Sequence, residues 1–175
     1  MILFRHADPR FPFLWESASQ PPARWHQSGE GPVHYLADTP DGAWAEFLRH
    51  EEIREPEDLE GINRALWAIE VPDPCEDRPG LPEEILFGDP ASYAECQAEA
   101  ARLRSRGLTG FRVVSAALLP KGARGSIVDG GLHPGPERGG EVYILFGRRP
   151  DLVGWKVVDD GRPPADLLSR VRHFE

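Results

Sequence analysis

The sequence contains little sulfur: 175 residues include two cysteines and one methionine. Cys75 and Cys96 are too few for a disulfide framework, and they do not form the CxxC pair of redox or zinc sites. Long apolar runs are also absent, so the sequence predicts no transmembrane helix, and its first residues lack the apolar segment of a signal peptide. We therefore expect a cytoplasmic protein that does not associate with membranes.

Basic residues are also fewer than acidic ones. Twenty lysines and arginines stand against 29 acidic residues, which gives a formal net charge of −9. Because nucleic-acid binding requires a basic surface, we expect no direct contact with nucleic acid. A local basic pocket for a small phosphate-bearing ligand remains compatible with this balance.

Glycine and proline are abundant, 18 of each, and predict long loops between the regular elements. The predicted strands and helices do not follow a regular βαβ rhythm, which favours a mixed α+β fold in a single domain over residues 1–175. We expect strands at 1–5, 33–37, 64–72, 110–119, 141–146 and 152–158, helices at 39–53, 89–107 and 163–174, and loops at 6–23, 72–90 and 121–140.

The helix expected at 39–53 carries the clearest local signals. Thr39 suits the N-cap and Pro40 the first helical position, and Trp44, Phe47 and Leu48 form part of an apolar stripe. Glu46 falls beside this stripe, and His50, four residues later, shares a face with Glu46. Such a pair is compatible with a solvated helix surface or with one wall of a cleft.

Three further polar residues are candidates, although each has a structural interpretation. Arg24 follows a proline-rich stretch, and its guanidinium suits a phosphate or carboxylate, but most single arginines are surface residues. Tyr35, within VHYLA, is typical of a half-buried strand tyrosine whose hydroxyl bonds the backbone. Ser115 is not framed as GxSxG, so it is not predicted to be a nucleophile.

Known metal and nucleotide signatures are missing. His26, His34 and His50 show no HExxH or paired-ligand spacing, so we expect no metal site. The glycine-rich stretches match neither GxxxxGK[ST] nor GxGxxG. Spacing alone therefore does not determine a function.

The order of these residues resembles the RES domain, a family named for an arginine, a glutamate and a serine. Its members begin with an arginine-bearing strand and continue with a GGRWN-like turn, a VxYLAxSPxxAxxE strand-to-helix unit and a VPSA-like strand. Here the corresponding segments are Phe4-Arg5, Ala23 to His26, Val33 to His50 and Val113 to Ala116. The resemblance is strongest over 1–50 and 108–120. Differences are Pro22-Ala23 for the two glycines, His26 for asparagine and Val114 for proline.

The resemblance implies a core similar to that of ADP-ribosyltransferases and an enzyme that degrades NAD. Family members cleave the nicotinamide–ribose bond by phosphorolysis or hydrolysis, so NAD is a substrate, inorganic phosphate a candidate co-substrate, and no prosthetic group is required. By this resemblance Arg24, with Arg5, binds the pyrophosphate, Glu46 meets the positive charge of the transition state, Tyr35 contacts nicotinamide, Ser115 hydrogen-bonds ribose or phosphate, and His50 lines the binding site.

The family also implies a biological setting. RES proteins are typically toxins of bacterial toxin–antitoxin pairs, so we expect an antitoxin partner of the DNA-binding Xre-like type. Two alternatives stay open: an ADP-ribosyltransferase that modifies a protein, and a degenerate module that binds NAD without catalysis, which the differences around Arg24 would favour. The sequence does not separate NAD from NADP or a monomer from an oligomer.

Overall fold

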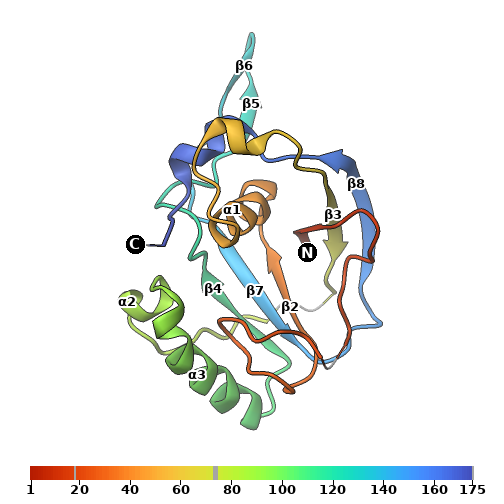
Figure 1. The fold of residues 1–175 in the computed structure, drawn as a ribbon, viewed down its shortest axis with the longest axis vertical. Helices are drawn as coiled ribbons and strands as arrows, with labels where there is room; N and C mark the ends of the chain where they lie inside the picture. The colour runs from red at the N-terminus through yellow and green to blue at the C-terminus, as the bar shows by residue number, and fades with distance from the viewer. Residues whose placement is uncertain (18, 73–74, 175) are drawn as a thin grey trace.

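The computed structural model describes residues 1–17, 19–72 and 75–174. Within these ranges, it confirms a mixed α+β domain built on a large antiparallel sheet (Figure 1). The strands of the main sheet are β1 (Ile2–Ala7), β2 (Val33–Ala37), β3 (Arg64–Glu70), β4 (Gly110–Val114), β7 (Glu141–Phe146) and β8 (Val153–Gly161). The α-helices are α1 (Pro40–His50), α2 (Glu83–Leu86) and α3 (Tyr93–Ser105).

The six strands follow the order β4-β7-β2-β1-β3-β8, and every neighbouring pair is antiparallel. β1 pairs with β3 along its whole length, and β2 does the same with β7. Between β1 and β2, in contrast, the pairing consists of Phe4 and Ala37 alone. The sheet therefore consists of two halves that meet at one residue pair and diverge beyond it.

Helix α1 lies over this junction and contacts both β1 and β2 (Figure 1). Its start is as predicted, because the Thr39 hydroxyl accepts a hydrogen bond from the Gly42 amide at 3.0 Å and Pro40 occupies the first position. Trp44, Phe47 and Leu48 are buried, which confirms the apolar stripe. The helix ends at His50, three residues before the predicted end.

Most predicted strands are confirmed, and Gly107 ends α3 with a φ of +85°, the left-handed conformation that glycine allows. The helix expected from residue 89 begins instead as a 3₁₀ turn, Pro90–Ser92, before α3. The strand expected at 110–119 ends at Val114, so the prediction was wrong for Ser115. There the chain turns, because the Ser115 hydroxyl accepts hydrogen bonds from the amides of Ala117 and Leu118.

Two predicted loops contain regular structure. Residues 72–90, of which 73 and 74 lie outside the described residues, include the short helix α2. Residues 121–140 include a hairpin of β5 (Ser126–Val128) and β6 (Leu132–Pro134), which projects from the domain (Figure 1). The last predicted helix is a 3₁₀ segment, Ala165–Arg170, because the following Val171 pairs with Leu118 instead of continuing the helix.

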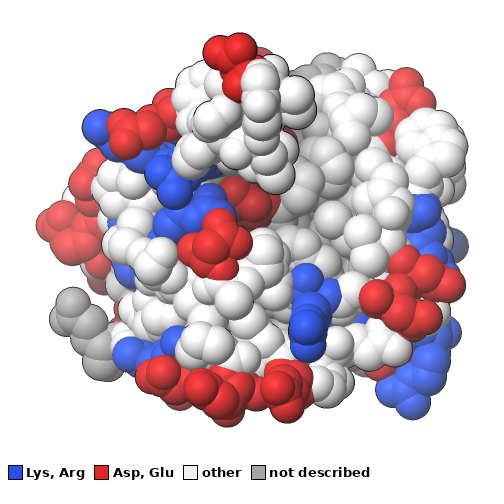
Figure 2. Space-filling model, turned by 90° about the horizontal axis from the view of Figure 1, so that it is seen from above, with Lys and Arg blue, Asp and Glu red and all other residues white. Residues whose placement is uncertain are grey.

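Charges are mixed over the surface. On the face shown in Figure 2, basic side chains lie next to acidic ones at several places, and wide areas carry neither. Many of the described arginines form ion pairs, for example Arg102 with Glu99 and Arg149 with Asp151. None of the helices in the described ranges is long and apolar enough to cross a membrane.

Candidate active site

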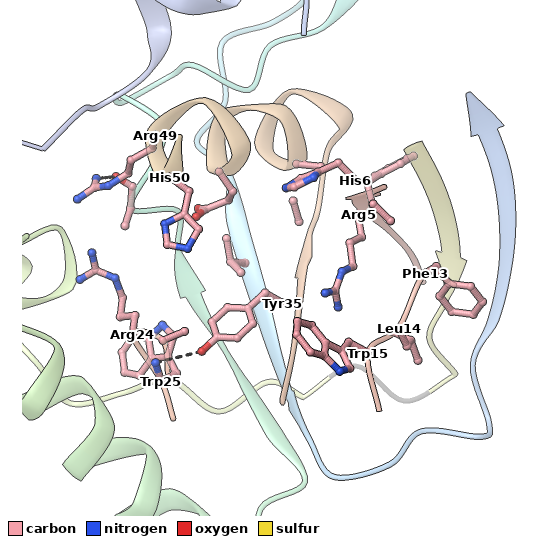
Figure 3. A pocket seen from close by; sticks show the side chains of 18 of the residues that line it. Arg5, His6, Phe13, Leu14, Trp15, Arg24, Trp25, Tyr35, Arg49 and His50 are labelled. Carbon is pink, nitrogen blue, oxygen red and sulfur yellow. Dashed lines mark hydrogen bonds between the residues drawn. The ribbon is translucent and has the colours of Figure 1, made fainter. Parts of the chain in front are cut away.

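A cavity of about 1140 Å³ opens where the two halves of the sheet diverge. It is large enough for a dinucleotide, since typical ligand pockets measure about 300–1,000 Å³. Its walls come from β1, β2, α1 and the loop that follows β1, whose aromatic side chains face the same space (Figure 3). Polar residues on the wall are Arg5, His6, Asp8, Glu16, Arg24, Tyr35, Glu46, Arg49, His50, Arg64, Tyr93 and Arg149.

Glu46 presents a carboxylate to this cavity from α1. The Ser115 hydroxyl donates a hydrogen bond to Glu46 Oε1 at 3.0 Å, and it accepts the Ala117 and Leu118 amides at 3.2 and 3.3 Å. Ser115 is 1% exposed and does not belong to the cavity wall. Its proton and its acceptor sites are thus used within the protein, so its position indicates that it orients Glu46.

Tyr35 reaches the cavity from β2 (Figure 3). Its hydroxyl accepts a hydrogen bond from the Trp25 amide at 3.1 Å and lies 3.0 Å from His26 Nδ1. His26 Nε2 bonds the Pro21 carbonyl at 2.9 Å. Because a carbonyl only accepts, Nε2 carries the imidazole proton, and Nδ1 accepts the proton of the Tyr35 hydroxyl. Burial raises the pKa of Tyr35, so the hydroxyl stays protonated and fixes the turn that carries Arg24.

Arg24 and Arg49 lie at one side of the cavity (Figure 3). Arg24 donates to the carbonyls of Ile85 and Gly88 at 3.2 and 2.7 Å, and its guanidinium covers the Tyr93 ring at 4.6 Å. Arg49 donates to the carbonyls of Phe87 and Gly88 at 2.8 and 3.0 Å, and also to that of Ala116. Both arginines therefore hold the turn after α2 against the cavity wall.

Arg49 lies in an electropositive position. Burial is the main cause that lowers the pKa of Arg49, and the positive charge of Arg24 lowers it further. The negative charge of Glu46 raises this pKa. Two guanidinium groups and one carboxylate are thus close enough to interact at the same part of the wall. An anionic ligand would be attracted to this side, and Glu46 offers the negative charge that a developing cation requires.

Arg5 and His6 lie at the opposite side (Figure 3). Arg64, from the neighbouring strand β3, donates to His6 Nδ1 at 3.2 Å. Burial, followed by the charges of Arg64, Arg5 and His50, lowers the pKa of His6 to about 3, so its imidazole is neutral. The cavity therefore has a second positively charged side, contributed by β1 and β3.

A family model for the RES domain matches residues 2–166. The chain belongs to the RES domain family. A curated relative, Toxin Res of Pseudomonas putida KT2440, is 52% identical over 50 residues, a match that covers 29% of this chain and 32% of the relative. The match thus spans about a third of the relative's length. In the solved M. tuberculosis MbcT–MbcA toxin–antitoxin complex, a chain of similar fold has a TM-score of 0.59 and 19% sequence identity, over 90% of this chain and 84% of that one.

In this RES domain, five of the six predicted site residues line one cavity: Arg5, Arg24, Tyr35, Glu46 and His50. Ser115 lies behind Glu46, where a direct hydrogen bond to ribose or phosphate would require the hydroxyl to give up its present partners. Their roles toward a ligand stay predictions. His26, which replaces the family's asparagine, is tied to Tyr35 and Pro21 and so maintains the arginine turn.

Sequence reasoning missed several polar cavity residues, among them Arg49, His6 and Arg64. Arg49 had a signal, because it follows Glu46 by three positions and so lies near it on the helix. His6 and Arg64 had none, because their contact depends on the register of β1 and β3. Within the described ranges, no group of three or more His, Cys, Asp or Glu side chains could hold a metal ion.

Proposed function

We propose that this RES domain cleaves the bond between nicotinamide and ribose in NAD. The observation that carries the proposal is a carboxylate, Glu46, held in place by Ser115 on the wall of a dinucleotide-sized cavity that has guanidinium groups on both sides. NAD carries a pyrophosphate and a cationic nicotinamide ring. A site that combines arginines with one oriented carboxylate suits both charges.

The residues then have complementary roles. Departure of nicotinamide leaves positive charge on the ribose, as in glycoside hydrolysis, and the Glu46 carboxylate stabilises this charge. The positive charge of Arg24 and Arg49 attracts the pyrophosphate. Tyr35 offers its ring to the nicotinamide, because its hydroxyl is already engaged with Trp25 and His26.

The reaction needs an acceptor for the ribose. Phosphate gives a phosphorolysis, water a hydrolysis, and a protein side chain an ADP-ribosyl transfer; the first bond cleavage is common to all three. We place phosphate first, because the cavity has a second positively charged side next to β1.

The direct test is nicotinamide release from NAD by the purified protein, with and without inorganic phosphate. Glu46→Gln removes the negative charge while keeping the shape, and we expect kcat to fall by about two orders of magnitude or more, as for loss of one transition-state contact. Glu51→Gln, which removes an exposed carboxylate just after the same helix, is the matched control. Equal activity of wild type and Glu46→Gln would refute the assignment, and NAD binding without release in wild type would identify a binding module.

We also propose that the protein acts as a toxin on cytoplasmic NAD and is neutralised by an antitoxin. The support is the family and the two relatives, one named as a toxin and one solved as a toxin–antitoxin complex. Expression of the wild-type chain in a bacterium should lower cellular NAD and slow growth, and Glu46→Gln should do neither. Normal growth with unchanged NAD would contradict this role.

A further inference from the structure

Three side chains of the cavity wall that can carry positive charge come from β1 and β3: Arg5, His6 and Arg64. His50, which lies beside Arg49 on α1 (Figure 3), lines the same cavity, and its charge contributes to the lowered pKa of His6. Arg64 Nη2 donates to His6 Nδ1 at 3.2 Å. Because a guanidinium only donates, Nδ1 must be the acceptor, so His6 carries its proton on Nε2. The ring is held in place by Trp44, which stacks at 6.3 Å, and by the edge of Phe47 at 5.0 Å. His6 is therefore a fixed, neutral hydrogen-bond donor.

Several donors in this group have no acceptor within the part of the chain that the structure describes. Arg5 Nη1 and Arg64 Nε are buried without a hydrogen-bond partner among the residues that the structure describes. In the same part of the chain, neither arginine forms an ion pair with a carboxylate, and His6 Nε2 makes no hydrogen bond. Buried donors are usually paired, so Arg5 Nη1 and Arg64 Nε, which belong to two residues of the same cavity wall, are available to an external acceptor.

The electrostatics of the group favour an anion. Burial lowers the pKa of Arg5 to about 10, and the charge of Arg64 contributes to this shift. The two half-buried cations repel each other, and neither forms an ion pair with a described carboxylate, although the charge of Arg64 contributes to the lowered pKa of Asp8 on the same wall. An anion of charge −2 between the two guanidinium groups would remove their repulsion. Arg24 and Arg49, in contrast, already donate to the carbonyls of the turn after α2.

The group also lies next to the carboxylate of the proposed reaction. His50 follows Glu46 by four residues on α1, and both line the cavity. Side chains four apart on a helix are neighbours. An anion bound by His6 and His50 would thus lie beside the ribose carbon whose charge Glu46 stabilises.

We propose that Arg5, His6, His50 and Arg64 form a subsite for inorganic phosphate, the acceptor of the ribose. This inference rests on the proposed function. An oxygen of HPO₄²⁻ forms a bond to ribose C1 while the bond from C1 to the nicotinamide nitrogen breaks. Nicotinamide leaves as a neutral molecule with the electron pair of that bond, and the phosphate proton stays on the new sugar phosphate. The step consumes no oxidant or reductant.

Phosphate binding can be measured without the reaction, by calorimetric titration of inorganic phosphate into the full chain in the absence of NAD. His6→Phe keeps an aromatic ring against Trp44 and removes the Nε2 donor, and Arg64→Gln removes one charge. We expect each to weaken phosphate binding by about 10-fold or more, the loss expected for a charge-assisted hydrogen bond. His6→Gln, which restores a donor, should recover part of the affinity. Arg102→Gln removes an exposed arginine on α3 and is the control.

The same variants in the nicotinamide assay separate the two proposals. A higher KM for phosphate in His6→Phe and Arg64→Gln, with the Kd for NAD changed much less, supports the subsite. If these variants bind phosphate as wild type does while wild type is active, the subsite is wrong and NAD cleavage stands. If phosphate binding depends on His6 and Arg64 but wild type releases no nicotinamide, the subsite stands and the proposed cleavage is wrong. If NAD competes with phosphate for the group, it binds the dinucleotide's own pyrophosphate, and the acceptor assignment is refuted.

Discussion

Replacement of Ser115 by alanine tests whether this serine is a structural support for Glu46. The substitution removes the hydrogen bond to the Glu46 carboxylate, and bonds to charged groups contribute about 1.5–3 kcal/mol. It also leaves the Ala117 and Leu118 amides, now 3.2 and 3.3 Å from the hydroxyl, without that acceptor. These two bonds are long, so we assign them the smaller share. We expect Ser115→Ala to lower the free energy of unfolding by about 2–3 kcal/mol, or Tm by about 5–10 °C.

Chemical denaturation followed by circular dichroism measures this change, and a double-mutant cycle with Glu46→Ala isolates the Ser115–Glu46 bond. We expect a coupling free energy of about 1 kcal/mol or more, since the two groups are in direct contact. Ser169→Ala is the control, because its hydroxyl is exposed and donates to the Asp166 carbonyl at 3.2 Å, so its loss should cost less than about 0.5 kcal/mol. Strictly additive effects of Ser115→Ala and Glu46→Ala would refute the supporting role.

Two further predictions concern stability. Burial, with the charge of Arg5, lowers the pKa of His34 to about 4, so the unfolded chain takes up this proton first as the pH falls below about 6.5. The free energy of unfolding should then decrease by about 1.4 kcal/mol per pH unit from pH 6.5 to 4, and denaturation curves of His34→Gln should show a flatter profile. In Gly88→Ala, a Cβ would lie 2.9 Å from the Glu84 carbonyl oxygen, so the turn must shift. We expect faster limited proteolysis within 83–92, and an unchanged cleavage rate would contradict the close packing.

The parts of the fold that sequence predicted well are those with dense local signals. β2 and β7 are short apolar runs bounded by glycine or proline, and α1 has a cap, a proline and an apolar stripe within ten residues. The β5–β6 hairpin was missed because its apolar residues are exposed and carry no alternation toward a core. Its turn did contain a signal, Asp129-Gly130, in which Gly130 has a φ of +65°.

The site residues also divide into those that have local sequence signals and those that do not. Arg24, Tyr35, Glu46 and His50 could be grouped in advance because they occupy one continuous stretch, residues 24–50, and the resemblance to a family supplied their roles. Which of these side chains reach the cavity and which lie behind its wall could not be predicted. Ser115 was expected within a strand, but it follows the end of β4. Its hydroxyl accepts hydrogen bonds from two backbone amides and donates to Glu46, and these contacts show that it lies behind Glu46 and not in the cavity.

The irregularity that creates the site is the interrupted pairing of β1 and β2. Phe4 opposes Ala37, so an uninterrupted antiparallel pair would place Arg5 opposite Leu36 and then His6 opposite Tyr35, with the Cβ atoms of each pair about 5 Å apart. Hydrogen-bonded strands would then close the space between β1 and β2, with their side chains projecting from the faces of the sheet. Because the pairing stops after one residue, β1 and β2 separate, and each presents its polar residues to the gap. The sequence of a single strand does not encode this separation, since it arises from β1 following β3 and β2 following β7.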